Sequence, residues 1–248
     1  MDEVHPLPTL VLSPRYTPDS QALWRAAIQR GWHVQRLTHW TAPPPVPINA
    51  PVVLYLEGGL AHSIAEALGL KLPEPPDNWL PQLPIEYRQR QIQLTTMEAA
   101  QALLPAFVKP PNDKRFPAKV YSSPAELPAE AADLPVLVAE VVVWEKEFRC
   151  FVLDRQLRTA SLYARYAAPQ DEADFASTAE EHAELEQFLQ HLLDDPQVEL
   201  PRAVVIDVGV IAGRGWAVVE LNAAWGAGIY GCDPAQVLEV VRYATERL

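Results

Sequence analysis

Two short apolar runs separated by a glycine-rich turn constrain this 248-residue chain more than any other feature. The runs cover residues 203–210 and 216–222, and both are rich in β-branched side chains, which indicates strands. Their close spacing predicts a β-hairpin. Side chains alternate between the two faces of a strand, so Glu220 and Asn222 point the same way, and a hairpin can bring Asp207 opposite them.

Two carboxylates and one amide oxygen therefore converge on one face of the predicted hairpin. Hard oxygen ligands of this kind suit Mg²⁺, which takes a few protein oxygens and completes its shell with water and substrate phosphates. The same residues are compatible with two acids at strand ends that simply face solvent. The spacing alone leaves both interpretations open.

Other charged residues precede the hairpin in a definite order, which runs lysine, lysine, glutamate, glutamate, arginine. Lys109 lies inside an apolar strand pattern. Because burying an unpaired cation is unfavourable, such a lysine either meets an anionic ligand or pairs with a protein carboxylate. The ordered residues are Lys109, Lys119, Glu140, Glu147, Arg149, Asp207, Glu220 and Asn222.

This ordered set resembles the ATP-grasp superfamily, and in detail the small clade named for an arginine and two lysines, whose members are predicted ligases. The matching stretches are residues 107–121, 138–153 and 205–231. The resemblance implies an α+β fold in which two α+β subdomains clasp ATP, within a domain of residues 78–248. It also implies an enzyme of the ATP-grasp ligase type.

The first part of the chain carries a different pattern, which predicts a small parallel α/β unit at residues 1–77. The resemblance implies that this unit precedes the two ATP-clasping halves. Proline-rich residues 41–47 are expected to form an extended connection, and proline-rich residues 72–81 are the candidate linker. The expected strands are residues 9–12, 33–37 and 52–56, and the expected helices are residues 20–30 and 60–68.

The second part is expected to mix antiparallel strands with flanking helices. The helical stretch at 84–104 is expected to carry Arg90 on its polar side, and the helix at 171–194 is expected to bury Phe175. A terminal helix is expected at residues 237–248. The remaining strands are expected at residues 137–143, 147–153 and 157–166 and around Lys109.

Composition narrows the function classes. The 49% hydrophobic and 21% charged residues are ordinary for a globular protein. The net charge of −12 argues against nucleic-acid binding through a basic surface. Neither a run of eighteen apolar residues nor a signal-like opening segment occurs, so no membrane association is expected. Cys150 and Cys232 form neither a disulfide framework nor a zinc motif, which fits a reducing cytoplasm.

The resemblance assigns nucleotide contacts residue by residue. Glu140 is expected to accept a hydrogen bond from the adenine amino group, and Glu147 is expected to accept from the ribose hydroxyls. Many relatives hold phosphates on a glycine-rich loop, but residues 110–118 contain no glycine, so side chains are expected to take that role. The implied nucleotide-binding residues are Lys109, Lys114, Lys119, Glu140, Val141, Val142, Val143, Trp144 and Glu147.

The same resemblance assigns catalytic and metal roles. Amino-acid ligases of the superfamily often carry an arginine two residues before the metal aspartate, where this chain has Val205. The oxyanion-stabilising role is therefore expected from Arg149, from Arg165 or from the backbone near Gly226 and Gly228, or it is absent. Lys119 is the third residue expected to be catalytic, through contact with a phosphate from the loop between the two lysines. One or two Mg²⁺ ions are expected on Asp207, Glu220 and Asn222.

The sequence thus predicts an ATP- and Mg²⁺-dependent carboxylate–amine (or thiol) ligase that works through an acyl phosphate on an amino acid, a peptide or a protein. Two alternatives stay open. One is a phosphotransferase that uses the same ATP site, and the other is a nucleotide-binding module without turnover. The sequence identifies neither the acceptor nor the oligomeric state.

Overall fold

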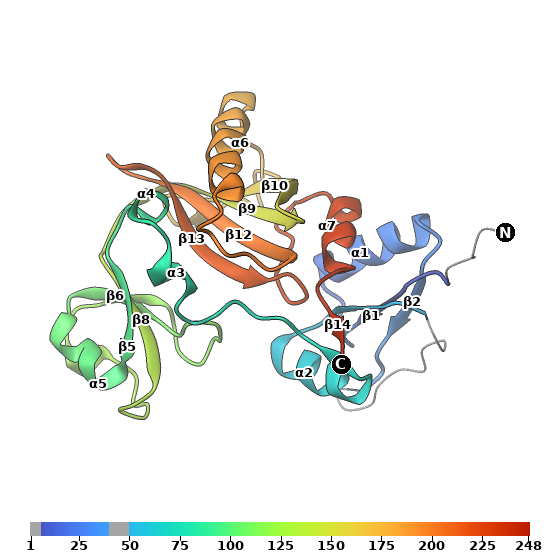
Figure 1. The fold of residues 1–248 in the computed structure, drawn as a ribbon, viewed down its shortest axis with the longest axis horizontal. Coiled ribbons are helices and arrows are strands. Elements are labelled where there is room, and N and C mark those ends of the chain that lie inside the picture. The colour runs from blue at the N-terminus through green and yellow to red at the C-terminus, as the bar shows by residue number, and fades with distance from the viewer. Residues whose placement is uncertain (1–5, 40–49) are drawn as a thin grey trace.

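The computed structural model describes residues 6–39 and 50–248 and arranges them in three parts. In Figure 1 a small sheet lies at the left, a larger sheet crowned by helix α6 (Ala179–Asp194) lies in the centre, and the amino-terminal unit lies at the right. The connection predicted at residues 41–47 lies outside the described residues. No helix in the described ranges has the length and apolar character needed to cross a lipid bilayer.

The amino-terminal unit is a three-stranded parallel sheet in the order β2-β1-β3, which confirms the expected α/β unit. Helix α1 starts two residues earlier than predicted, because proline is well tolerated in the first turn and Thr17 accepts a hydrogen bond from the Ser20 amide at 3.1 Å. The elements are β1 (Thr9–Leu12), α1 (Pro18–Gln29), β2 (His33–Arg36), β3 (Val52–Tyr55) and α2 (Gly58–Ala67).

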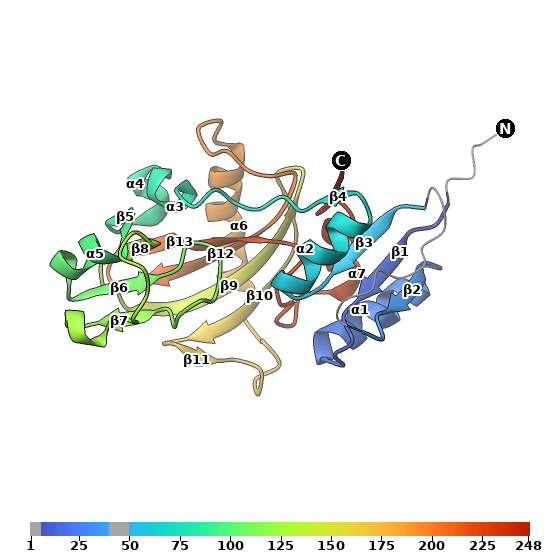
Figure 2. The same cartoon turned by 90° about the horizontal axis from the view of Figure 1, so that it is seen from below.

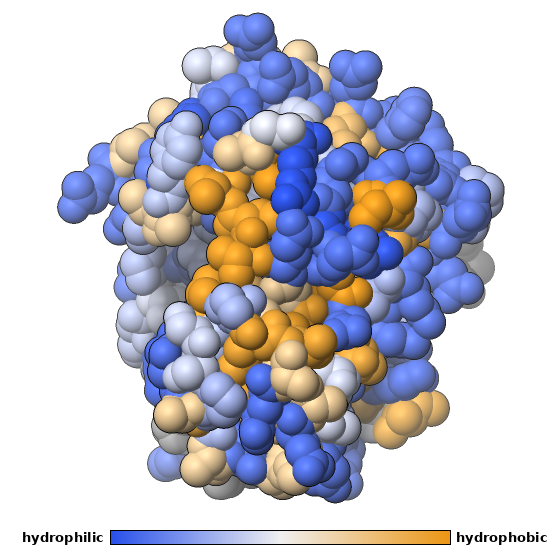
Figure 3. Space-filling view, turned by 90° about the vertical axis from the view of Figure 1, so that its left-hand side faces the viewer, coloured by the Kyte–Doolittle hydropathy of each residue, from blue (hydrophilic) through white to orange (hydrophobic). Residues whose placement is uncertain are grey.

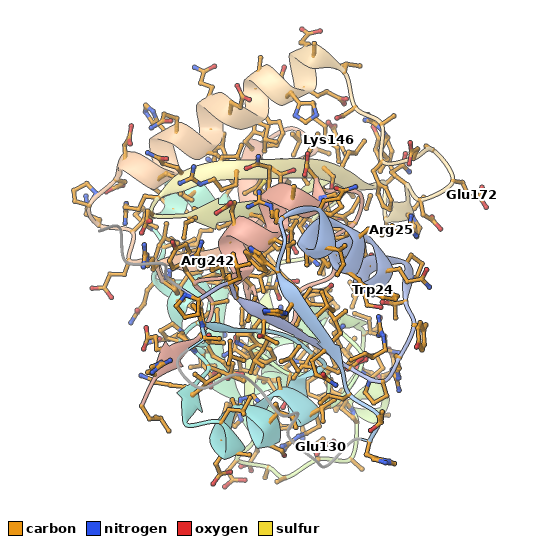
Figure 4. The ribbon with its side chains drawn as sticks, turned by 90° about the vertical axis from the view of Figure 1, so that its right-hand side faces the viewer. Trp24, Arg25, Glu130, Lys146, Glu172 and Arg242 are labelled. Atoms are coloured by element: carbon orange, nitrogen blue, oxygen red, sulfur yellow. The ribbon has the colours of Figure 1, made fainter. Side chains whose placement is uncertain are left out.

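The end of the chain returns to this unit. Helix α7 (Pro234–Val241) lies beside α1, as Figure 4 shows, with Trp24 and Arg25 on the outer side of α1. Strand β14 (Glu246–Arg247) then pairs with β4 (Leu70–Lys71). The predicted terminal helix was therefore too long at its end, because residues after Val241 find a strand partner far earlier in the chain.

The large sheet is antiparallel, in the order β11-β10-β9-β12-β13, and confirms the predicted hairpin. Helix α6 covers one face by packing Leu185, Leu189 and Leu192 against sheet residues such as Phe148. The helix begins at Ala179 and not at residue 171, because Thr178 and Glu181 form a capping box there. The strands are β9 (Trp144–Leu153), β10 (Gln156–Arg165), β11 (Ala168–Pro169), β12 (Ala203–Ile211) and β13 (Gly215–Ala223).

The small sheet has the order β5-β8-β6-β7 and its own core around Val108 and Tyr121. The helix predicted at residues 84–104 was wrong, since β5 (Ile92–Thr96) occupies its centre and pairs with β8 (Pro135–Ala139). Residues 140–143, predicted as strand, leave the sheet and connect β8 to β9. The other elements are β6 (Ala106–Lys109), β7 (Lys119–Tyr121), α3 (Trp79–Gln82), α4 (Ile85–Arg88), α5 (Met97–Ala100) and two short 3-10 helices, Gln101–Leu103 and Pro124–Glu126.

Candidate functional site

A cavity of about 310 Å³ lies between the small and the large sheet. Figures 1 and 2 show the small sheet next to the large sheet, and Figure 3 shows a band of hydrophobic side chains on the side of the molecule where the small sheet lies. Charged groups also reach this cavity, namely Arg90, Lys109, Glu140, Glu147 and Glu220. Its apolar lining includes Leu80, Ile92, Phe107, Leu137, Val142 and Trp144.

The three predicted metal ligands lie together, and one of them, Glu220, lines this cavity. Asp207 on β12 faces Glu220 on β13 in register. The Asn222 amide nitrogen donates to Asp207 Oδ2 at 3.2 Å and to Glu220 Oε1 at 3.1 Å. The convergence that the hairpin pattern predicted is therefore present, and the interpretation of two separate solvent-facing acids is excluded for Asp207, which is 1% exposed.

Arg149 on β9 neutralises Asp207. Its Nε and Nη2 atoms donate to the two carboxylate oxygens at 2.9 and 2.6 Å, and its Nη1 donates to the Gly228 carbonyl at 2.9 Å. The guanidinium also lies 4.4 Å from the centre of the Tyr230 ring. Burial raises the pKa of Asp207 and the Arg149 charge opposes that rise, so this pair is a buried ion pair that depends on both partners.

Lys109 at the end of β6 pairs with the Glu220 carboxylate. Although burial raises the pKa of Glu220, the Lys109 ammonium outweighs burial and lowers that pKa to about 2. The lysine comes from the small sheet and the glutamate from the edge strand of the large sheet. The structure shows Lys109 paired with a protein carboxylate, one of the two kinds of partner expected for it, and the contact bridges the two sheets.

Two β-bulges aim side chains into the cavity. On β9, Glu145 is an extra residue between the pairs Lys146–Val210 and Trp144–Ile211, so Trp144 comes to line the cavity together with Glu147. On β13, Val219 is an extra residue between the pairs Asp207–Glu220 and Val208–Val218. Because of each bulge, an odd-numbered and an even-numbered residue of the same strand lie on the same face of the sheet.

Glu147 lies between the apolar part of the cavity and the metal-ligand cluster. Its Oε2 accepts a hydrogen bond from the Tyr163 hydroxyl at 2.9 Å. Burial raises the pKa of Glu147, and the Tyr163 hydrogen bond opposes the rise. The Tyr163 ring stacks on Tyr230 at 5.3 Å between centres, so Glu147 is connected to the surroundings of Arg149 through two aromatic rings.

Glu140 is held by an arginine that the sequence analysis did not consider. Arg214, in the turn between β12 and β13, donates Nη1 to Glu140 Oε2 at 3.0 Å and Nη2 to Oε1 at 2.5 Å. This pair and the Gln91 amide lower the pKa of Glu140 to about 2. Val141 and Val142 line the cavity next to Glu140, whereas Val143 is exposed and lies outside the lining.

Arg90 is a further cavity residue that the sequence analysis missed. It is 6% exposed, donates to the Val218 and Val219 carbonyls at 2.8 and 3.1 Å, and lies 4.8 Å from the centre of the Trp144 ring. Burial lowers its pKa to about 10. The predicted helix at residues 84–104 placed Arg90 on a face exposed to solvent. The alternating pattern of residues 92–96, which indicates a strand, is the signal that would have taken Arg90 out of that helix.

Two predicted lysines lie away from the cavity lining. Lys119 pairs in register with Val108, and its ammonium lies 4.8 Å from the centre of the Tyr121 ring. Val108 and Tyr121 belong to the core of the small sheet, so Lys119 is on the face opposite the cavity. Lys114 is exposed on the segment between β6 and β7.

Arg165 is also separated from the cluster. Its two terminal nitrogens donate to the Glu181 carboxylate at 2.8 Å each, at the start of helix α6. It pairs in register with Lys146, which also contacts Glu181 at 3.6 Å. The helix-covered face of the sheet therefore holds Arg165, and of the predicted arginines only Arg149 reaches the metal-ligand cluster.

Gly209→Ala is expected to destabilise the protein by about 1–3 kcal/mol, as overpacking does. A Cβ at Gly209 would lie 2.5 Å from the Lys146 carbonyl oxygen and 2.9 Å from the Trp144 ring, so the cavity wall must shift. Urea unfolding measures the loss. Gly59→Ala is the matched control, because a Cβ there meets nothing within 4 Å; equal stability of both variants would contradict the close approach.

Comparison with known proteins decides the family. A family model for the ATP-grasp domain, the second family of the clade named for an arginine and two lysines, matches residues 87–240, more than half of the chain. The chain belongs to this ATP-grasp family. A comparison with curated proteins found no match.

Several solved structures share the ATP-grasp fold at low identity. The ATP-grasp ligase PsnB, complexed with a phosphomimetic variant of its minimal precursor, Mg and ADP, is 14% identical with a TM-score of 0.52, over 98% of this chain and 99% of that one. A RiPP-associated ATP-grasp ligase from Chryseobacterium gregarium, in complex with ADP and a leader and core peptide, is 13% identical with a TM-score of 0.53, over 98% and 99%. The macrocyclase MdnC, bound with precursor peptide MdnA from Microcystis aeruginosa MRC, is 12% identical with a TM-score of 0.52, over 95% and 99%.

The donor set of this ATP-grasp domain fits magnesium. In the described part of the chain no three His, Cys, Asp or Glu side chains form a metal-binding group, and the donors that would hold a metal here are the two carboxylates and the Asn222 amide. Few protein oxygens of this hard type suit an ion that keeps water and phosphate oxygens as its other ligands. Sites for zinc use nitrogen and sulfur ligands that this cluster lacks.

Proposed function

We propose that this ATP-grasp protein is an ATP- and Mg²⁺-dependent ligase that joins a carboxylate to an amine or thiol through an acyl phosphate. One observation carries the proposal: the apolar cavity between the sheets is lined by Glu220 and its partner Lys109. Asn222 links Glu220 to Asp207, which pairs with Arg149. An apolar pocket for a base, continuous with cations and hard oxygen ligands, suits a nucleoside triphosphate.

Strand β9 sets the direction of the nucleotide. Trp144, Glu147 and Arg149 follow one another along it, and five residues of strand span roughly 16 Å. The base lies at Trp144 and Val142, the ribose at Glu147, and the transferred phosphoryl group near Arg149. Beyond Arg149 the same strand enters the core of the amino-terminal unit through Phe151, so the acceptor approaches from that side.

The residues of the chain act mainly by position and charge. Lys109 and Arg149 supply positive charge where the phosphoryl group is transferred, in a cleft where water is partly excluded. Bound Mg²⁺ would add Lewis-acid stabilisation of the phosphate oxygens from Asp207, Glu220 and Asn222. Arg149 is already oriented by Asp207 and the Gly228 carbonyl, so little reorganisation is needed during the reaction.

A peptide or protein acceptor is favoured by the relatives. PsnB, the Chryseobacterium gregarium ligase and MdnC are each described in complex with a precursor or a leader and core peptide, and each aligns over nearly its full length with this chain.

Hydroxylamine distinguishes the proposed chemistry from a phosphotransferase. An acyl phosphate reacts with hydroxylamine to give a hydroxamate, whereas a phosphorylated hydroxyl or imidazole product does not. Detection of a phosphorylated product and no hydroxamate would show that the protein is a phosphotransferase and not a ligase.

ATP is expected to raise the melting temperature clearly when Mg²⁺ is present and only slightly when it is chelated. A ligand that binds only the native state stabilises it by about 2.7 kcal/mol at a hundred times Kd. Thermal unfolding with ATP, with and without Mg²⁺, tests this, and ATP with excess chelator is the control. An ATP shift that is the same with and without Mg²⁺ would count against the metal assignment, and no shift in either would count against nucleotide binding.

A further inference from the structure

The carboxylate oxygens of Asp207 and Glu220, at the predicted metal site, all accept hydrogen bonds from protein side chains. Arg149 covers Asp207 Oδ1 and Oδ2, Asn222 donates to Asp207 Oδ2 and Glu220 Oε1, and Lys109 donates to Glu220 Oε2. The charges also balance, because two carboxylates face one guanidinium and one ammonium. A divalent cation that arrived alone would meet a neutral cluster that already holds two positive charges, which disfavours its binding.

The two cations differ in how easily they can leave. Arg149 is 6% exposed and is fixed by a bidentate pair with Asp207 and by the Gly228 carbonyl. Lys109 makes one contact at the end of a flexible chain, and its side chain and that of Glu220 are 17% and 30% exposed. A planar, bidentate guanidinium is held more rigidly than a point-charge ammonium, so Lys109 is the exchangeable partner.

Lys109 also sits where a nucleotide enters. It and Glu220 both line the cavity between the sheets, and their contact joins the small sheet to the large sheet. A triphosphate carries enough negative charge to attract the ammonium away from Glu220. Glu220 is then left without its cation and becomes available to a metal ion that accompanies the nucleotide.

We propose that Lys109 is the resident cation of the metal site, holding Glu220 until a nucleotide draws it to a phosphate, so that the protein takes up its divalent ion only together with the nucleotide. The proposal deepens the proposed function and rests on it for the identity of the site. It concerns a property that can be measured without turnover, namely metal binding in the absence of any nucleotide.

Binding of Mn²⁺ alone, measured by electron paramagnetic resonance or calorimetry, tests the proposal. The wild type is expected to bind Mn²⁺ weakly, and Lys109→Met is expected to bind it on the order of tenfold more tightly, because Glu220 loses its competing cation. Lys71→Met is the matched control: it removes the same charge from an exposed lysine on β4 and is expected to behave as the wild type. Adding Glu220→Gln to Lys109→Met is expected to abolish the gain.

Three results would overturn the proposal: wild-type Mn²⁺ affinity as high as that of Lys109→Met, the same gain in Lys71→Met, or a gain that survives Glu220→Gln. Mn²⁺ binding is also measured for Lys109→Gln, which removes the charge but keeps a side chain that donates a hydrogen bond. Circular dichroism tests whether each variant is folded. If the wild type binds no ATP even with Mn²⁺, the proposed function is wrong. That measurement is separate from Mn²⁺ binding without nucleotide, so the two failures can be told apart.

Discussion

Glu220→Gln is expected to fold normally and to lose ATP turnover by a factor on the order of 10²–10³. The substitution keeps the shape of the side chain and its contact with Asn222, but it removes one of the two carboxylates that face each other across the hairpin. Metal affinity falls, and with it the neutralisation of charge on the transferred phosphoryl group. ADP release in the presence of mixed amino acids and peptides measures the loss.

The control for this variant is Glu199→Gln, which removes the same charge from an exposed glutamate that does not line the cavity. It should match the wild type in turnover and in melting temperature. A well-folded Glu220→Gln protein with wild-type ADP release would show that Glu220 is not a metal ligand. A poorly folded one would show instead that its contact with Lys109 is needed for the fold.

Arg149→Leu is expected to destabilise the protein by about 3–5 kcal/mol, because it leaves the Asp207 charge buried without a partner. Urea unfolding at neutral pH measures the loss. The deficit should shrink as the pH is lowered. Burial raises the pKa of Asp207, so the folded variant takes up a proton more readily than the unfolded chain, and its stability increases as the pH falls.

Arg202→Leu is the comparison for an exposed ion pair, since Arg202 and Asp154 are 57% and 51% exposed and such pairs are worth about 0–1 kcal/mol. The double variant Arg149→Leu, Asp207→Leu should recover much of the lost stability, because no unpaired charge remains. If Arg149→Leu is no more harmful than Arg202→Leu, the buried pair is not a structural unit, and Arg149 would be free to act on a ligand alone.

Local pattern was sufficient for the elements whose residues pair with near neighbours. The hairpin that carries Asp207 and Glu220 closes over a short turn, so a period of two and a glycine-rich break predict both the strands and their facing residues. The amino-terminal unit follows for a similar reason, since each strand and helix there has a clear period and a clear stop. The order of charged residues then carried the family resemblance, which the family match confirms.

Pairing with distant partners decided the rest. Strand β5 forms because β8, far along the chain, offers an edge, and this pairing turns Arg90 from an expected surface residue into a cavity residue. The face of Lys119 depends on its register with β6, and Arg214 reaches Glu140 across 74 positions.

The bulges at Glu145 and Val219 show the same division within single strands. By alternation alone Trp144 and Glu147 belong to opposite faces, yet both line the cavity, because one extra residue between them shifts the alternation. The sequence by itself determined the hairpin that carries the site and which acids face each other across it. Only the tertiary structure decided which cations meet those acids, because register, bulges and sheet edges depend on partner strands that no local window contains.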